Sequence, residues 1–201
     1  CIGKSVKETV SVVRKLLGMS PDWALHKADS AAVIRTLIEL LEEKGCVISV
    51  QGYVGSYNRR QLSVSDCRGF ALIDTYAPFI YVNNNDIKEA QYFTLIHEFA
   101  HLLIGFSSGY GSGSDNDDQR EDFCDNVAAL FLVDDTLLHQ KWNGNIDNMA
   151  RTFRVSKIMM ARRAHEEKLI NDGDYRAYMD AYWDNVREHP AVKISGKSGG
   201  D

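Results

Sequence analysis

The most constraining feature of this 201-residue sequence is the stretch FTLIHEFAHLL, Phe93–Leu103, in which three ionisable side chains interrupt an apolar run. His97 and His101 are four residues apart, so on a helix they lie one turn apart on the same face, with Glu98 beside them. A buried glutamate is costly to desolvate unless a cation or strong donors receive it. The pattern His-Glu-x-x-His therefore predicts a helix that presents two imidazoles to one metal ion.

A catalytic zinc ion usually has three protein ligands and an open fourth position, so the two histidines need a third partner. Glu121 is the best-placed candidate, because it opens the next predicted helix, after the Gly- and Ser-rich loop 105–119. Asp125 lies four residues later on the same helical face, where its carboxylate would accept the outer N–H of a metal-bound histidine. Sequence alone leaves three rivals for the third ligand: Asp117, Asp118 and Asp122.

These residues predict peptide hydrolysis. Zinc lowers the pKa of its bound water, Glu98 takes the proton, and the hydroxide attacks a peptide carbonyl. Such enzymes need a donor to steady the developing oxyanion, for which Tyr110 and His165 are the candidates. The strand FIYV, Phe79–Val82, directly precedes the motif helix and is the candidate edge for an extended peptide substrate.

The remaining pattern predicts an α+β fold. Two amphipathic helices open the chain, and the runs CVISV, GFALID and FIYV follow as three or four short strands. Asp86 and Glu89 resemble a capping box that opens the motif helix, over about 87–103. Further helices are expected from about 120, and over 135–142, 146–153, 156–168 and 175–186.

Net charge, cysteine content and hydrophobicity indicate which classes of protein the sequence does not fit. A net charge of −5 excludes a general basic field for nonspecific nucleic-acid binding. The four cysteines have no metal-type spacing, which indicates reduced thiols. No apolar run approaches the roughly 20 residues of a membrane span, and no signal peptide is recognisable. We therefore expect a cytoplasmic protein without a membrane partner.

The blocks RGFALID, PFIYVNNND, FTLIHEFAHLL and EDFCDNVAALFLV resemble, in that order, the ImmA/IrrE family of metallopeptidases. In that family the segment after the motif is close to E-x-F-C-N-x-x-A-A-x-x-L-V-P, which independently implies Glu121 as the third ligand. Two positions depart from it: Asp125 stands where asparagine is frequent, and Asp134 where proline is usual. The resemblance covers roughly residues 30–186.

The resemblance implies a zincin-like fold, in which a small, mostly antiparallel sheet packs on the motif helix. We expect four segments along the chain. They are an N-terminal helical segment at 1–29, the metallopeptidase domain at 30–143, a helical, helix-turn-helix-like extension at 144–190 and a disordered tail at 191–201.

Members of this family act on helix-turn-helix repressors in mobile-element or stress-response gene regulation. The resemblance thus implies a zinc-dependent endopeptidase with a protein substrate, a helix-turn-helix repressor. One alternative is a non-catalytic sensor or binding module with the same fold. The other alternative, and the less favoured of the two, is a DNA-contacting regulator that acts through residues 146–170.

The DNA alternative depends on Lys157, Arg162 and Arg163, which could touch phosphates. Glu166 and Glu167 follow directly and the whole chain is acidic. We therefore expect the extension to serve packing or protein contacts, and direct DNA binding is the less favoured interpretation.

Overall fold

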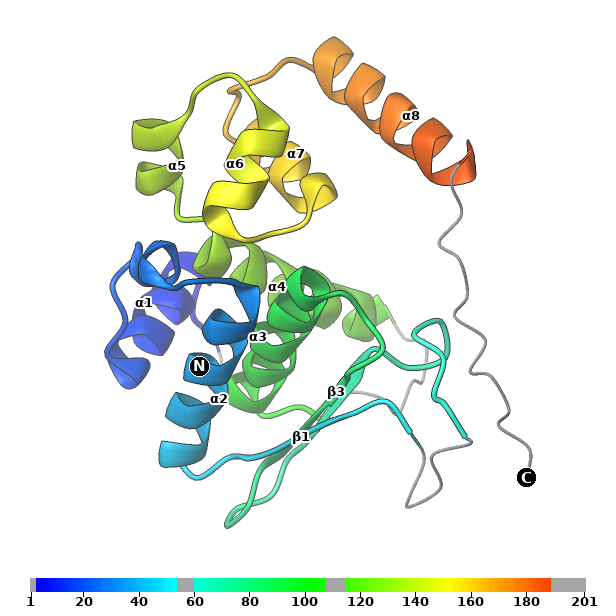
Figure 1. Ribbon diagram of the computed structural model, residues 1–201. Coiled ribbons are helices and arrows are strands. Elements are labelled where there is room, and N and C mark those ends of the chain that lie inside the picture. Colours follow the sequence, from blue (N-terminus) through cyan, green and yellow to red (C-terminus); the bar gives the residue numbers. More distant parts are fainter. Residues whose placement is uncertain (1–2, 54–59, 108–114, 189–201) are drawn as a thin grey trace, which may run out of the picture.

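The computed structural model describes residues 3–53, 60–107 and 115–188 (Figure 1). Within these ranges it contains eight α-helices, one short 3-10 helix and one three-stranded sheet. The predicted α+β class is confirmed. The predicted disordered tail, 191–201, lies outside the described residues.

The N-terminal helices begin and end at strong local signals. Helix α1, Val6–Leu17, opens with a capping box in which the Ser5 hydroxyl and the Glu8 carboxylate each accept from the other's backbone N–H. It ends at Gly18, whose φ of 65° is left-handed. After a 3-10 helix, Trp23–His26, helix α2, Ser30–Glu43, starts from the Asp29 cap.

The sheet has the order β1-β3-β2, with β1 Val47–Gln51, β2 Gly69–Leu72 and β3 Phe79–Asn83. Strand β2 pairs antiparallel with β3, whereas β1 pairs parallel with it, so the sheet is mixed rather than mostly antiparallel. Strand β2, which precedes β3 in sequence, lies on one side of β3, and β1 lies on the other side. The predicted edge role of Phe79–Val82 is therefore wrong, because β3 is the central strand.

Side chains alternate between the two faces of the sheet, as the two-residue strand period requires. Ala71, Ile80 and Val82 point into the core and are buried. On the opposite face, the rings of Phe70 and Tyr81 stack with their centroids 5.2 Å apart. The motif helix packs against this apolar inner face.

The motif helix is α3, Lys88–Ile104, which packs across β2 and β3. The predicted capping box does not form: the cap residue is Ile87, which has no side-chain cap bond. The Asp86 carboxylate accepts from the Ile87 backbone N–H, and Glu89 instead accepts from the Ser30 hydroxyl at 2.9 Å. Glu89 thus ties the start of α3 to the start of α2.

Helix α4, Asp115–Leu132, lies between α3 and α1 (Figure 1). It starts five residues before the predicted position near Arg120, because the acidic residues read from sequence as loop favour a helix N-terminus. At its other end, Arg14 of α1 donates to the carbonyls of Leu130 and Phe131. These bonds satisfy acceptors that a helix end leaves open.

The C-terminal extension consists of α5 Asp135–Lys141, α6 Ile146–Phe153, α7 Lys157–Glu166 and α8 Asp172–Glu188. The predicted turn between α6 and α7 is confirmed, with Arg154 left-handed at φ 58°. Helices α5 to α7 sit on one end of the body, and α8 reaches away from it (Figure 1). No residue of α8 is buried.

Most of the buried apolar side chains of the described residues form one cluster. It includes Val13 from α1, Leu95 from α3 and Phe153 from α6. The segment boundaries near residues 29 and 143 stay a prediction, and the cluster crosses both of them. Among the described helices, none combines the length and apolar character needed to cross a bilayer.

Candidate metal centre

The three predicted ligands come together where α3 packs against α4. His97 and His101 project from one face of α3, and Glu121 projects toward them from the first half of α4. The candidate ligand atoms of the three residues all lie within 4.8 Å of one another. Glu121 is thus the carboxylate that the structure brings to the histidines.

The distances suit a tetrahedral ion. The two Nε2 atoms are 3.0 Å apart, and the Glu121 carboxylate oxygens lie 3.1 Å from that of His97 and 3.3 Å from that of His101. Tetrahedral ligands about 2.0–2.2 Å from zinc are roughly 3.3–3.6 Å apart. The side chains present therefore fit a metal of this kind with small adjustments.

The three side chains of the group differ in their exposure to solvent. His101 is fully buried, the side chain of His97 is 13% exposed, and that of Glu121 is 50% exposed. One side of the group therefore faces solvent, from which a substrate could enter. The three rival aspartates do not join the group: Asp117 pairs with Arg120 at 3.1 Å, while Asp118 and Asp122 are exposed.

The two histidines have opposite pKa shifts. Burial lowers the pKa of His97, but the contact with Asp125 and the charges of Glu98 and Glu121 outweigh it, so the pKa is raised overall. Burial, followed by the neighbouring His97, holds the pKa of His101 below its usual value. His101 is thus favoured in the neutral form that metals bind.

Asp125 lies behind His97, as predicted. Its carboxylate oxygen is 2.8 Å from Nδ1 of His97, the nitrogen opposite the one that faces Glu121. A proton on Nδ1 would be directed to this carboxylate, which leaves the Nε2 lone pair for a metal. Cys124, which stands between Glu121 and Asp125 in the sequence, is buried, and burial raises the pKa of its thiol. Cys124 is therefore a neutral core side chain.

Glu98 lies under strand β2. It is only 5% exposed, and a Cβ atom built on Gly69 would lie 3.3 Å from its Cγ and 2.4 Å from Cγ2 of Thr94. Only glycine lets the strand approach the helix this closely without displacing a neighbour. Sequence reasoning missed this role, although a glycine at the start of a predicted strand is a usable signal for close backbone approach.

The segment after α3 contacts α4 beside Glu121, the candidate third ligand. The guanidinium of Arg120, the neighbour of Glu121, lies 4.2 Å from the centre of the Phe106 ring. This contact connects the end of α3 to the turn of α4 that bears Glu121. Tyr110, predicted as a candidate oxyanion donor, lies outside the described residues.

His165, the other candidate donor, belongs to α7 and faces α8. Its Nε2 lies 2.7 Å from a carboxylate oxygen of Asp172, and its ring stacks on Tyr175 at 4.5 Å. It is not part of the group formed by the two motif histidines and Glu121.

The three cations that could have touched phosphates are paired with carboxylates. Lys157 lies 2.6 Å from Asp147, and Arg162 lies 2.7 Å from Glu166. Arg163 is buried and donates to the carbonyl of Val133 as well as to carboxylates. The predicted packing role of these residues agrees with these contacts.

The chain is similar to known proteins in family and in fold. The family model Peptidase_M78, described as the IrrE N-terminal-like domain, matches residues 57–165, more than half of the chain. No curated protein matches. A solved structure, a Mycobacterium tuberculosis transcriptional regulator, shares the fold with a TM-score of 0.51 at 13% identity. That match covers 79% of this chain and 45% of the regulator, so the chain spans less than half of that protein's length. The matched segment contains the two motif histidines, Glu98 and Glu121, and the chain belongs to the IrrE N-terminal-like family of metallopeptidase domains.

Proposed function

We propose that the chain is a zinc-dependent endopeptidase whose metal ligands are His97, His101 and Glu121. The observation that carries this proposal is the convergence of two imidazole Nε2 atoms and one carboxylate within 4.8 Å, beside a further buried carboxylate. A set of two nitrogens and one oxygen with an open side is typical of catalytic zinc, whereas structural sites close the fourth position.

When bound, zinc would act as a Lewis acid and would make water acidic enough to lose a proton near neutral pH. Glu98 is the residue that would accept this proton, because it follows the first ligand on the same helix and lies against β2. Its carboxylate would later deliver the proton to the leaving amine.

The substrate strand would lie along β2. This strand pairs with β3 on one side, and no described strand pairs with its other edge. Gly69 brings its start against Glu98, while Leu72 and Ile73 at its end are 37% and 44% exposed. An extended peptide added to this edge would have its backbone close to the proton acceptor and its side chains on exposed apolar surface.

A regulatory protein, specifically a helix-turn-helix repressor in the cytoplasm, is the substrate class that we propose. The family membership and the helix-turn-helix-like pair α6 and α7 support a role in gene regulation. The mycobacterial protein that shares the fold is named a transcriptional regulator, which is in keeping with this role.

The proposal is tested first by metal content. Elemental mass spectrometry of the purified protein should find about one zinc per chain, lost in His101→Ala and in Glu121→Ala. Asp118→Ala is the matched control, because Asp118 is an exposed carboxylate on the same helix as Glu121. Wild-type protein that takes up no metal after zinc addition contradicts the proposal.

The second test separates the enzyme from a non-catalytic sensor or binding module. Glu98→Gln should keep its zinc and lose the ability to generate new protein N-termini in a lysate of the source cells. If wild type and Glu98→Gln bind zinc equally and neither generates N-termini, the binding module is the correct interpretation. Direct DNA binding is disfavoured, since the candidate cations are paired with carboxylates.

A further inference from the structure

A second candidate site lies away from the metal centre, under helix α8. A cavity of about 760 Å³ opens between the second half of α8 and the surface where α6 and α7 meet the starts of α2 and α3. Ligand sites for small molecules usually measure about 300–1,000 Å³. The size therefore matches a small molecule rather than a folded partner.

One wall of the cavity is apolar and aromatic. Tyr178, Tyr182 and Val186 line it at a spacing of four residues, so they form one stripe along α8. No residue of α8 is buried, and this stripe is only half covered. A helix in a protein gains most of its stability from packing such a face. A ligand in the cavity would supply the missing apolar contact.

The opposite wall is positively charged after internal pairs are counted. The Asp147 carboxylate is engaged by Lys157 at 2.6 Å and by the Tyr178 hydroxyl. Glu89, the other acid in the lining, accepts from the Ser30 hydroxyl at 2.9 Å. These two carboxylates are therefore already provided with donors.

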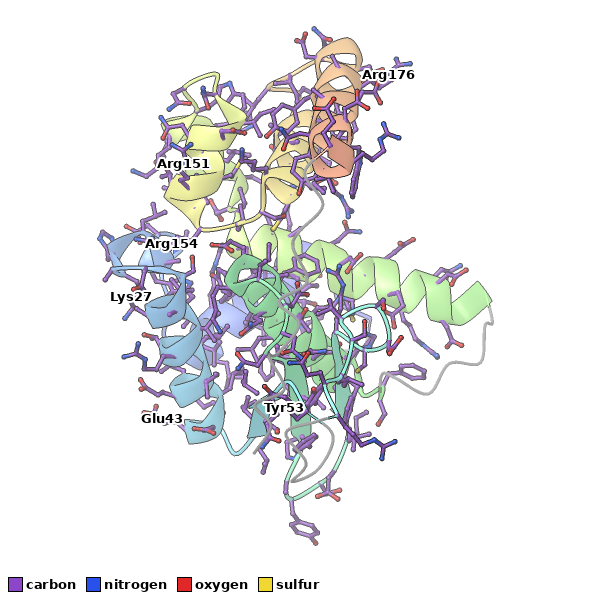
Figure 2. The ribbon with its side chains drawn as sticks, turned by 45° about the vertical axis from the view of Figure 1, so that its right-hand side comes forward. Lys27, Glu43, Tyr53, Arg151, Arg154 and Arg176 are labelled. Atoms are coloured by element: carbon purple, nitrogen blue, oxygen red, sulfur yellow. The ribbon has the colours of Figure 1, made fainter. Side chains whose placement is uncertain are left out.

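The two arginines of this wall differ in whether their guanidinium groups are free to bind a ligand. Arg154 donates to the carbonyls of Ala24 and Lys27, which fixes its guanidinium at the junction with the body (Figure 2). Arg151 is exposed, and among the described residues its guanidinium has no hydrogen bond or ion pair. Arg151 helps to lower the pKa of the Asp147 carboxylate, but the two side chains form no ion pair. In a chain of net charge −5, this wall therefore presents a guanidinium without a directly bound carboxylate beside an aromatic surface.

We propose that this cavity binds a small amphiphilic anion, with its acidic group at Arg151 and its apolar or aromatic part against Tyr178 and Tyr182. Guanidinium groups bind carboxylate and phosphate with two parallel hydrogen bonds, and tyrosine rings bury large apolar areas. The ligand would contact α8 and the body at once, and so would hold α8 in place. The inference does not depend on the metal centre.

The test uses phenyl phosphate as the probe, with inorganic phosphate and phenol as its two halves. In amide NMR spectra of the full chain, phenyl phosphate should give saturable shifts at Ile87, Arg151 and Tyr182, with millimolar affinity. Each half alone should bind at least tenfold more weakly, because the site needs both its cation and its aromatic wall.

The variant Arg151→Glu should lose phenyl phosphate binding by at least tenfold. Arg176→Glu is the matched control, because it makes the same charge change on α8 outside the cavity lining, where Arg176 lies away from Arg151 (Figure 2). Tyr182→Ala tests the aromatic wall in the same way.

Three outcomes would overturn the proposal: the absence of saturable shifts in the wild type, an equal loss in Arg151→Glu and Arg176→Glu, or binding of inorganic phosphate as strong as that of phenyl phosphate. Binding of an acidic peptide without binding of phenyl phosphate also overturns it, because the groove would then be a protein-docking surface. Well-dispersed spectra of all three variants establish that they are folded.

Discussion

The carboxylate of Asp125 lies 2.8 Å from Nδ1 of His97, on the side of the imidazole ring away from Glu121. Through this contact, α4 both provides a candidate ligand and orients a histidine of α3. Both groups lie on one helical face, four residues apart.

Truncation of Asp125 should weaken metal binding without removing a ligand. We expect Asp125→Ala to lower zinc affinity by about 10- to 100-fold, since a partner of this kind fixes the ring and its tautomer. Asp125→Asn should retain most of the affinity, because its amide oxygen can still accept from Nδ1. Competition titration with a chromophoric chelator measures both variants, with Asp118→Ala as the control. Equal affinities for Asp125→Ala and the wild type would show that His97 is oriented by other contacts.

Gly69 should not tolerate a side chain. A Cβ atom there would lie 2.4 Å from Thr94 Cγ2 and 2.8 Å from the Tyr81 carbonyl oxygen. We expect Gly69→Ala to lower the free energy of unfolding by about 1–3 kcal/mol, as overpacking does. Urea denaturation measures this effect. Adding Thr94→Ser, which removes the nearer atom, should restore part of it, whereas Gly173→Ala at the start of α8 should be close to neutral.

Asp134 replaces the proline that is usual in the family, and the structure gives the residue two roles. Its carboxylate accepts from the Leu137 backbone N–H at 3.0 Å, which caps α5, and it lies 2.7 Å from Arg14 of α1. Asp134→Ala should cost about 1–2 kcal/mol of unfolding free energy, the usual loss for a helix cap. In urea denaturation, Asp134→Asn should retain the cap and lose less. Equal losses in the two variants would assign the effect to the pair with Arg14 instead.

Asp135 should make stability depend on acid pH. Burial alone would raise its pKa, but Lys7 and Arg163 outweigh burial and hold the pKa below its ordinary value of 3.8. Its contribution is therefore complete above pH 3.8 and is lost as the pH falls through the lower folded-state pKa. The difference in unfolding free energy between wild type and Asp135→Asn should be constant from pH 5 to 7 and should shrink below pH 3.8. A difference that stays constant in acid would show that the pKa of Asp135 is the same in the native and the unfolded state.

The spacing of the candidate ligands within each helix could be predicted from sequence, because it is a local property of helices. Four residues bring His97 to His101 on any helix, and the same interval brings Glu121 to Asp125. The order of the strands could not be predicted in this way, because pairing joins segments far apart in the chain. The run Phe79–Val82 has the same composition at the centre of a sheet as at its edge, so its assignment as the substrate edge failed.

The start of α4 was placed too late for a related reason. A cluster of Asp and Asn residues is common in loops and equally suited to the first turn of a helix, and only packing against α3 decides between them. Among the cations of α7, Arg162 and Arg163 pair with Glu166 at helical spacing, which the sequence shows, whereas the partner of Lys157 could not be predicted in this way. The carboxylate of Asp147, which pairs with Lys157, is ten residues away along the chain.

The bonds from Arg154 to the 3-10 helix have a consequence for the order in which the chain folds. Arg154 and Ala24 are 130 residues apart in sequence, yet their contact sits beside the single apolar cluster. Closing so long a loop costs entropy before any packing repays it, and native structures rich in such distant contacts form slowly. In a nascent chain the 3-10 helix therefore gains these bonds only after the residues of α6 and Arg154 have been synthesised.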